Sequence, residues 1–149
     1  MLVKELMTHP VLTVTPDAPI KEVAEILYSH GITGVPVVEK DTGALVGLVT
    51  EKNFLTADNK VYLPTYIHMM ETDRSNPEAQ KMLDARANDV MLTQVNSVTP
   101  DSTVQELVNM FALRNVNPVP VVDIEKKVVG IVSRSDLVRL LAKDPKALT

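Results

Sequence analysis

Cysteine and tryptophan are absent from the 149-residue sequence, and aromatic residues make up only 3% of it. The absence of cysteine excludes disulfides, thiolate metal ligands and cysteine nucleophiles, and it fits a protein of the reducing cytosol. Because aromatic rings provide the stacking platforms for single-stranded nucleic acid, their scarcity argues against that class of ligand. The sequence therefore offers no cysteine chemistry and little basis for binding unpaired bases.

Long apolar runs are also missing, since no stretch approaches the roughly 20 residues needed to cross a bilayer. The first residues, Met1 to Pro10, contain Lys4 and Glu5, so we expect no signal peptide, no membrane partner and a cytoplasmic location. With 19 acidic against 15 basic residues, the net charge of −4 argues against nucleic acid as a general partner. The hydrophobic content of 45% is enough to bury a core, so we expect a folded chain.

Sequence motifs of catalysis are lacking as well. The chain contains no G-x-x-x-x-G-K-[ST], G-x-G-x-x-G, G-x-S-x-G or H-E-x-x-H pattern. Its histidines, His9, His30 and His68, are far apart, and a metal site would need the fold to bring them together. We therefore expect no enzymatic activity, no catalytic residue and no bound metal.

What the chain does contain is an internal repeat. Residues 6–38 match residues 90–122 at 11 of 33 positions, with a constant offset, as between Thr15 and Thr99 (99 − 15 = 84). Random matching at average residue usage gives about two identities, so duplication is the better explanation. The offset falls by one after the stretch 41–43, and a length difference at that point indicates a turn between two strands.

Each copy has the pattern of a β-α-β-β-α unit. In the first copy, Val11–Thr15, Val35–Val38 and Leu45–Val49 are short runs rich in β-branched residues, which is typical of strands. Apolar residues within Ile20–Leu27 recur at helical spacing, and Glu51–Ala57 forms a short amphipathic closing helix. The second copy repeats these features in the same order.

Capping residues support the longer helices. Asp17 or a neighbour can cap the first one, which Pro19 helps to start, and Ser102 with Gln105 fits a capping box in the second copy. A single unit of about 50 residues would have a thin core. We therefore expect an α/β (α+β) fold in which two units pack sheet to sheet.

The segment between the copies is interpreted as an insert. The residues from Asp58 to Met82 have no counterpart, and they combine apolar side chains with a polar stretch from Glu71 to Gln80. We therefore divide the chain into repeat 1 at 1–57, a partly helical connecting segment at 58–84, and repeat 2 with a C-terminal tail at 85–149.

Both copies place a hydroxyl and an acidic or amide side chain at the same spacing after a buried strand. Gly47–Asn53 and Gly130–Asp136 share the pattern Gly-hydrophobic-Val-[Thr/Ser]-x-x-[Asn/Asp]. A hydroxyl beside the free N–H groups of a helix start suits a phosphate, whereas a carboxylate one turn on can accept from both hydroxyls of a ribose. Thr50 and Ser133 are equally well explained as N-cap residues when each is taken alone.

Together these motifs resemble the cystathionine β-synthase (CBS) domain, present here as a tandem pair. The motifs that carry the resemblance are ordered and doubled. They are Thr15-Pro16-Asp17, Val35-Pro36-Val37-Val38 and Gly47 to Asn53 in copy one, and Thr99-Pro100-Asp101, Val119-Pro120-Val121-Val122 and Gly130 to Asp136 in copy two. The resemblance covers nearly everything except the insert and the C-terminal tail, and it implies a pseudo-twofold disc that often dimerises.

The resemblance also implies two clefts between the copies that can bind AMP, ADP, ATP or S-adenosylmethionine. In the first cleft it implies Asp136 for the ribose hydroxyls, with Ser133 and Arg134 for phosphates. It further places Thr15 and Ile20 near the base, with Thr33, Gly34, Val35 and Pro36 as the backbone edge. Gly34 would permit a close backbone approach, and Arg134 would supply a cation for phosphate oxygens. We therefore expect this to be the primary ligand site.

The second cleft departs from the family pattern. By matching position it would use nine residues, namely Thr50, Lys52, Asn53, Thr99, Val104, Asn117, Pro118, Val119 and Pro120. Asn53 replaces the usual aspartate, and an amide accepts from a cis-diol less strongly than a carboxylate. Pro118 stands where copy one has Gly34, so a backbone N–H is lost. We expect this site to be weaker, empty or tuned to another ligand.

The resemblance thus implies a regulatory sensor module for an adenosine nucleotide, working as a homodimer with an unidentified regulated protein as a further partner. A ligand held by both copies favours the arrangement that presents both, which transmits its occupancy. The alternative is a ligand-free dimerisation or partner-docking module. In the insert, we expect Tyr62 and Tyr66 to pack onto the body and Leu63–Met70 to lie near the subunit interface.

Overall fold

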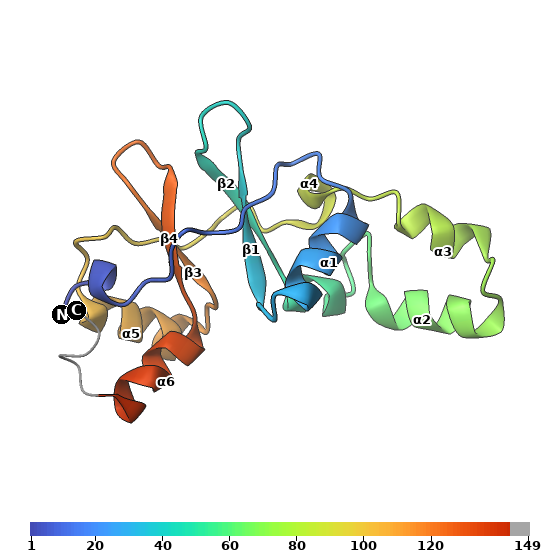
Figure 1. Ribbon diagram of the computed structural model, residues 1–149. Helices are drawn as coiled ribbons and strands as arrows, with labels where there is room; N and C mark the ends of the chain where they lie inside the picture. Colours follow the sequence, from blue (N-terminus) through green and yellow to red (C-terminus); the bar gives the residue numbers. More distant parts are fainter. Residues whose placement is uncertain (144–149) are drawn as a thin grey trace.

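The computed structural model describes residues 1–143 and places two similar units side by side (Figure 1). The first unit consists of α1 (Ile20–Ser29), β1 (Gly34–Val38), β2 (Leu45–Thr50) and the 3-10 helix η2 (Glu51–Leu55). The second consists of α5 (Val104–Arg114), β3 (Val119–Val122), β4 (Val128–Val132) and α6 (Arg134–Ala142). The expected mixed α/β fold of two repeats is confirmed, and the end of the C-terminal tail, 144–149, lies outside the described residues.

The first strand expected in each repeat is reduced to a single bridging residue. Val14 forms a parallel bridge to β1 and donates its N–H to the carbonyl of Pro36 at 3.0 Å. Extending this ladder in either direction would need a donor at the backbone nitrogen of Pro16 or Pro36, and proline has no N–H. The predicted strand over Val11–Thr15 is therefore wrong in its length, and Val98 makes the corresponding single bridge in the second repeat.

The caps of the two long helices also differ from expectation. Thr103 is the N-cap of α5, and its hydroxyl accepts a hydrogen bond from the N–H of Glu106 at 3.1 Å. The capping box predicted for Ser102 and Gln105 is thus wrong by one residue, because Ser102 accepts a bond within the preceding turn instead. The N-cap position of α1 is taken by Pro19, whose fixed φ favours the start of a helix.

Two short helices that were not predicted from the sequence lie at the start of the two repeats, and we call the segments that carry them, residues 1–8 and 85–92, the leaders. They are η1 (Val3–Glu5) and α4 (Ala87–Val90). Each leader packs into the core of the other repeat: Val3 and Leu6 lie in the core of the second repeat, and Ala87 lies in that of the first. The two cores therefore exchange segments.

The exchange continues along the backbone. Thr8 and Ile131 of β4 exchange two N–H···O bonds of 2.9 and 3.1 Å, and Leu92 and Leu48 of β2 exchange two of 2.9 and 3.0 Å. Each leader thus adds one residue pair to the hairpin of the other repeat. This arrangement brings the chain around Thr8 to the start of α6, where a site between the repeats can form.

The glycine in the centre of each closing strand makes room for a leader methionine. A Cβ atom on Gly47 would collide with the sulfur of Met91, and a Cβ atom on Gly130 would collide with the sulfur of Met7. Glycine at these two positions thus leaves the space that the methionine side chain occupies. The glycine of the repeated motif is therefore explained by packing between the repeats.

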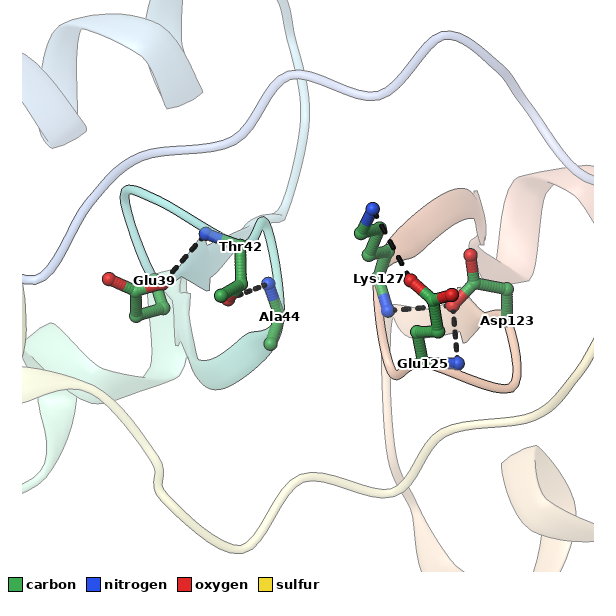
Figure 2. A network of polar contacts seen from close by, with 6 residues as sticks. All are labelled: Glu39, Thr42, Ala44, Asp123, Glu125 and Lys127. Atoms are coloured by element: carbon green, nitrogen blue, oxygen red, sulfur yellow. Dashed lines mark hydrogen bonds and ion pairs between the residues drawn. The ribbon is translucent and has the colours of Figure 1, made fainter.

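The turns of the two hairpins lie beside one another (Figure 2). The carboxylate of Glu39 accepts from the N–H of Thr42 at 2.7 Å, and that of Asp123 accepts from the N–H of Lys127 at 2.9 Å, so each turn is held by its own acidic residue. The N–H of Leu45 donates to the carbonyl of Lys126 at 2.9 Å and joins the turns. The predicted turn at the length difference is thus correct.

The insert forms an arm at the far end of the first repeat, away from the second (Figure 1). It contains α2 (Leu63–Thr72) and α3 (Pro77–Met82), and the side chain of Asn76 caps α3 by accepting from two backbone N–H groups. Tyr62 and Tyr66 are half-buried. Among the residues that the structure describes, helices long and apolar enough to cross a bilayer are not found.

Candidate functional site between the two repeats

A cleft of about 530 Å³ opens between the repeats, at the start of α6. Four segments line it: the stretch 8–12, the loop before β1, the loop before β3, and the junction of β4 with α6. The lining residues are Thr8, Pro10, Val11, Leu12, Gly31, Ile32, Thr33, Gly34, Asn117, Pro118, Ile131, Ser133, Arg134, Ser135 and Asp136. We call this hollow the first cleft; the predicted residues Thr33, Gly34, Ser133, Arg134 and Asp136 meet in it.

Asp136 is the buried acidic group of the first cleft, with 7% of its surface exposed. Its Oδ2 accepts from the N–H of Ser133 at 2.8 Å and from the Ser133 hydroxyl at 3.2 Å, so it reaches back over the first turn of α6. Its Oδ1 lies 3.4 Å from a guanidinium nitrogen of Arg139. Capping and ligand binding are therefore compatible, because a carboxylate has about four lone-pair sites and these contacts use three donors.

Arg134, predicted as the phosphate cation, is held by two asparagine side chains. Its guanidinium donates to Oδ1 of Asn115 at 2.7 Å, and its backbone N–H donates to Oδ1 of Asn117 at 3.1 Å. Asn115 adopts a left-handed backbone conformation with φ 52° at the end of α5, which turns its side chain toward α6. Arg134 thus lines the first cleft, and its hydrogen bonds are made to residues of its own repeat.

The close approach expected at Gly34 is made by a protein side chain. A Cβ atom on Gly34 would lie 2.6 Å from Cδ of Pro118 and 3.2 Å from the methyl group of Thr50. Since Pro118 is the repeat equivalent of Gly34 (118 − 34 = 84), the two residues pack across the pseudo-twofold axis. Gly34 is therefore required first of all by the contact between the repeats.

Four residues expected in the first cleft lie elsewhere. Thr15 lines a separate hollow near Arg86, and its hydroxyl donates to the carboxylate of Asp17. Ile20 is buried in the core of the first repeat, as are Val35 and Pro36 of β1. These four residues are therefore not among those that line the first cleft, and their role in ligand binding stays a prediction.

The stretch 8–12, which was not predicted from the sequence, lines the first cleft, whereas the later Thr15 does not. The reason is the single-residue strand at Val14, which leaves the preceding residues out of the sheet and free to run along the other repeat. The signal available in the sequence was the repeat alignment, which already begins before Thr8 and pairs it with Leu92.

The second cleft, of about 260 Å³, is the repeat equivalent of the first. Its lining residues are Leu48, Thr50, Lys52, Asn53, Thr56, Leu92, Gln94, Val95, Asn96, Asn115, Val116, Asn117 and Pro118. Asn53, 6% exposed, accepts from the N–H of Thr50 at 2.6 Å, as Asp136 does in the first cleft. Of the predicted set, five residues meet here: Thr50, Lys52, Asn53, Asn117 and Pro118.

The other four residues of that set do not line the second cleft. Val104, Val119 and Pro120 are buried in the interior of the second repeat, and Thr99 bonds Ser102 in the turn before α5. Their place is taken by the stretch 92–96, the counterpart of 8–12. The lining of both clefts thus differs from the predicted set in the same way, as expected for a duplicated unit, and the binding roles of these four residues stay predictions.

Asn117 and Pro118 form the wall between the two clefts, because both residues line each of them. The amide nitrogen of Asn117 lies 3.4 Å from the hydroxyl of Thr33 in the other repeat. Among the described residues that line the clefts, Arg134 and Asp136 carry the charges of the first, and Lys52 carries that of the second. Clusters of three or more potential metal ligands are not found in the described part of the chain.

Comparison with known proteins agrees with this architecture. The family model of the CBS domain matches residues 3–60 and 87–143. The uncharacterized protein MJ1426 of Methanocaldococcus jannaschii is 28% identical, over 95% of this chain and 91% of its own.

Two solved structures share the fold. The CBS domain pair of protein MJ0100, crystallised with 5′-methylthioadenosine and S-adenosyl-L-methionine, is 27% identical with a TM-score of 0.70, over 95% of this chain and 96% of its own. CBSX2, crystallised with AMP, is 22% identical with a TM-score of 0.72 over 95% and 96%, which supports the fold alone. The chain belongs to the CBS domain family and carries the domain as a tandem pair.

Proposed function

We propose that this protein is a regulatory module that binds an adenosine-containing ligand in the first cleft. The likeness to the MJ0100 domain pair, which was crystallised with 5′-methylthioadenosine and S-adenosyl-L-methionine, supports an adenosine ligand. The ligand acts as a signal, and the protein's own residues perform no catalytic step.

The observation that carries the proposal is the position of Asp136. Its carboxylate is buried in a cleft between two repeats and is held in place by the N–H and hydroxyl of Ser133. A buried, oriented carboxylate with a lone-pair site left over is suited to accept a hydrogen bond from a hydroxyl of a ribose. The apolar residues Val11, Leu12 and Ile131, which also line the cleft, suit an adenine ring.

Signal transmission follows from the composition of the cleft. Thr33 and Gly34 come from the first repeat, whereas Ser133 and Asp136 come from the second. A ligand that contacts both sets binds best to one arrangement of the repeats and stabilises that arrangement over others. Occupancy thereby becomes a change of shape or rigidity that a regulated partner protein can recognise.

We further propose that the module works as a cytoplasmic homodimer. Leu113 at the end of α5 and Leu141 on α6 are 82% and 90% exposed, and Val138 on α6 is also exposed. Association with a second copy through α5 and α6 would cover these exposed apolar side chains. These exposed residues also suit the alternative of a ligand-free docking module.

Thermal unfolding with adenosine ligands tests the proposal. Each of 5′-methylthioadenosine, S-adenosylmethionine, AMP, ADP and ATP is added, and a ligand at about 100 times its Kd should stabilise the protein by about 2.7 kcal/mol. Asp136→Ala should remove most of that stabilisation, whereas the matched variant Asn53→Ala in the second cleft should retain it. An unchanged melting temperature with all five ligands would favour the docking module, and native mass spectrometry gives the number of chains in the same preparation.

A further inference from the structure

The buried carboxylate of the first cleft is joined to the first leader by one arginine side chain. Nη2 of Arg139, on α6, lies 3.4 Å from Oδ1 of Asp136 and donates to the backbone carbonyl of Leu6 at 3.3 Å. Leu6 ends η1 as its C-cap residue, and its side chain is buried in the core of the second repeat. Asp136 and the first leader therefore share one donor nitrogen.

The guanidinium of Arg139 is held by these two contacts, and both are long. Charge-assisted N–H···O bonds are typically about 2.7–2.9 Å. Its Nε is buried and forms no hydrogen bond with the residues that the structure describes. A buried donor without a partner is unfavourable, so a shift that brings an acceptor closer to this guanidinium is favourable. The contacts of Arg139 can thus be strengthened when either neighbouring oxygen becomes better fixed.

The first leader runs directly into the first cleft. Two residues after Leu6, Thr8 exchanges backbone hydrogen bonds with Ile131 of β4, and both Thr8 and Ile131 line the cleft. The rest of the stretch 8–12 contributes Pro10, Val11 and Leu12 to the lining. Loosening the leader at Leu6 would therefore also loosen a segment that lines the cleft.

The first repeat holds the second leader in a related way but without the charge. Val90 is the repeat equivalent of Leu6 (90 − 6 = 84). Its carbonyl accepts from the side-chain amide of Asn59 at 3.3 Å, and the same nitrogen donates to the backbone carbonyl of Asn53 at 2.9 Å. In the first repeat the connection thus ends at the backbone of Asn53, whereas in the second it reaches the carboxylate of Asp136.

We propose that Arg139 is a positioning residue for ligand binding in the first cleft, and that it couples ligand binding at Asp136 to the packing of the first leader at Leu6. The inference rests on the proposed function, because it concerns regulation of the same cleft. Arg139 is not among the residues that line the cleft, so it acts through Asp136. A ligand hydroxyl that bonds the carboxylate fixes it, and the fixed carboxylate holds the guanidinium against Leu6. Because coupling is reciprocal, a firmly packed leader tightens ligand binding by the same factor.

Isothermal titration calorimetry of three variants tests the positioning role. The probes are AMP and 5′-methylthioadenosine, and binding that persists in Asp136→Ala is assigned to the second cleft. Arg139→Met keeps an unbranched side chain without the charge, and it should weaken the tighter probe by about tenfold or more. Arg139→Lys keeps a cation that can donate to both oxygens and should restore most of the affinity. Asn59→Ala, the matched change in the first repeat, should leave the affinity unchanged.

Amide hydrogen exchange with and without saturating probe tests the coupling. Val3 and Lys4 report on the first leader, because their N–H groups donate to carbonyls in the turn before α5 and neither residue lines the cleft. In the wild type, the probe should slow exchange at these two amides more than at Val38 of β1. In Arg139→Met this additional slowing should disappear. An arginine with a structural role alone would change the rates equally with and without the probe.

The outcomes separate this inference from the proposed function. If Arg139→Met binds the probe as tightly as the wild type, or if Arg139→Lys is as weak as Arg139→Met, the positioning role is overturned while the proposed function stands. If the additional slowing at Val3 and Lys4 persists in Arg139→Met, the coupling through this arginine is refuted. If neither probe binds the wild type, the proposed function fails together with the inference. Circular dichroism of each variant confirms that it is folded.

Discussion

Gly34 of the first repeat and Pro118 of the second lie against one another across the pseudo-twofold axis. A Cβ atom on Gly34 would be 2.6 Å from Cδ and 2.9 Å from Cγ of the proline ring. The pair is asymmetric, because the space that a side chain at position 34 would need is filled by the proline ring. This contact fixes how closely the two repeats approach, and both clefts open beside it.

Gly34→Ala should therefore destabilise the protein by about 1–3 kcal/mol, the range typical of overpacking. The proline ring is rigid, so it cannot move aside as a flexible side chain would. Urea unfolding of Gly34→Ala, Pro118→Ala and the double variant gives the coupling between the two sites. The alanine at 34 should be less harmful when Pro118 is absent; an equal loss in both backgrounds would show that the ring is not responsible.

The exchange of leaders predicts that a residue near the N-terminus stabilises the second repeat. Leu6 is 1% exposed in the second core, so Leu6→Ala should lower the free energy of unfolding by about 2–5 kcal/mol. Leu55→Ala, at a side chain that is 61% exposed, is the matched control and should cost about 0.5 kcal/mol or less. In Leu6→Ala, amide hydrogen exchange should become faster in β3 and β4 before it does in β1 and β2. The reverse order would contradict the packing of the first leader in the second repeat.

The cap of α5 can be assigned by a pair of substitutions. Thr103→Ala removes the hydroxyl that accepts from the N–H of Glu106, and it should cost about 1 kcal/mol. Gln105→Ala should be nearly neutral because its amide bonds only Asn109 on the exposed face. Chemical unfolding of both variants measures the difference. Equal losses would restore the capping box that the sequence suggested.

Asp89 should make the stability depend on acid pH. The N–H of Arg86 donates to its carboxylate at 2.8 Å, and the Lys60 ammonium adds a bond of 3.0 Å, so both hold the pKa of Asp89 below its ordinary value of 3.8. A lowered folded-state pKa stabilises the protein above pH 3.8, and this contribution is lost as the pH falls through the folded-state pKa. Asp89→Asn should therefore flatten the fall in unfolding free energy below about pH 4.

The cause of that pH dependence can be separated by a second variant. Because the backbone bond from Arg86 has the larger effect on the pKa of Asp89, Lys60→Met should retain most of the acid sensitivity. Urea titrations from about pH 5 down to about pH 2.5 record both slopes. A slope in Lys60→Met as flat as that of Asp89→Asn would assign the effect to the ammonium instead.

The repeat itself could be predicted from the sequence because identical residues return at a fixed offset. The hairpins could also be predicted, because Val35–Val38 and Leu45–Val49 each have the composition of a strand. The leaders could not, because η1 and α4 are each less than two turns long and owe their structure to packing in the other repeat. The first strand was overestimated since its residues have β propensity, whereas its hydrogen bonds depend on prolines in the neighbouring strand.

The candidate site shows the same division. Ser133 and Asp136 line the first cleft, and their spacing along α6 is a local property that the sequence reveals. Thr15 and Ile20 do not line it, because which part of the chain faces the cleft depends on how the leader crosses to the other repeat. The binding roles of all four residues stay predictions. The hydrogen bond from Arg134 to Asn115 joins residues 19 positions apart. It depends on the left-handed backbone of Asn115, which the periodicity of the sequence does not reveal.

Because Val3 and Leu6 fill the second core, and Ala87 and Val90 fill the first, neither repeat contains all of its own interior. A chain with a single repeat would have a gap in its core and a leader without a core to pack into. A second chain would have to supply the missing leader and the missing core. Joining two repeats in one chain supplies both at a high effective concentration. The duplicated protein is thus the covalent counterpart of a segment-swapped dimer, and its folding does not depend on meeting a partner.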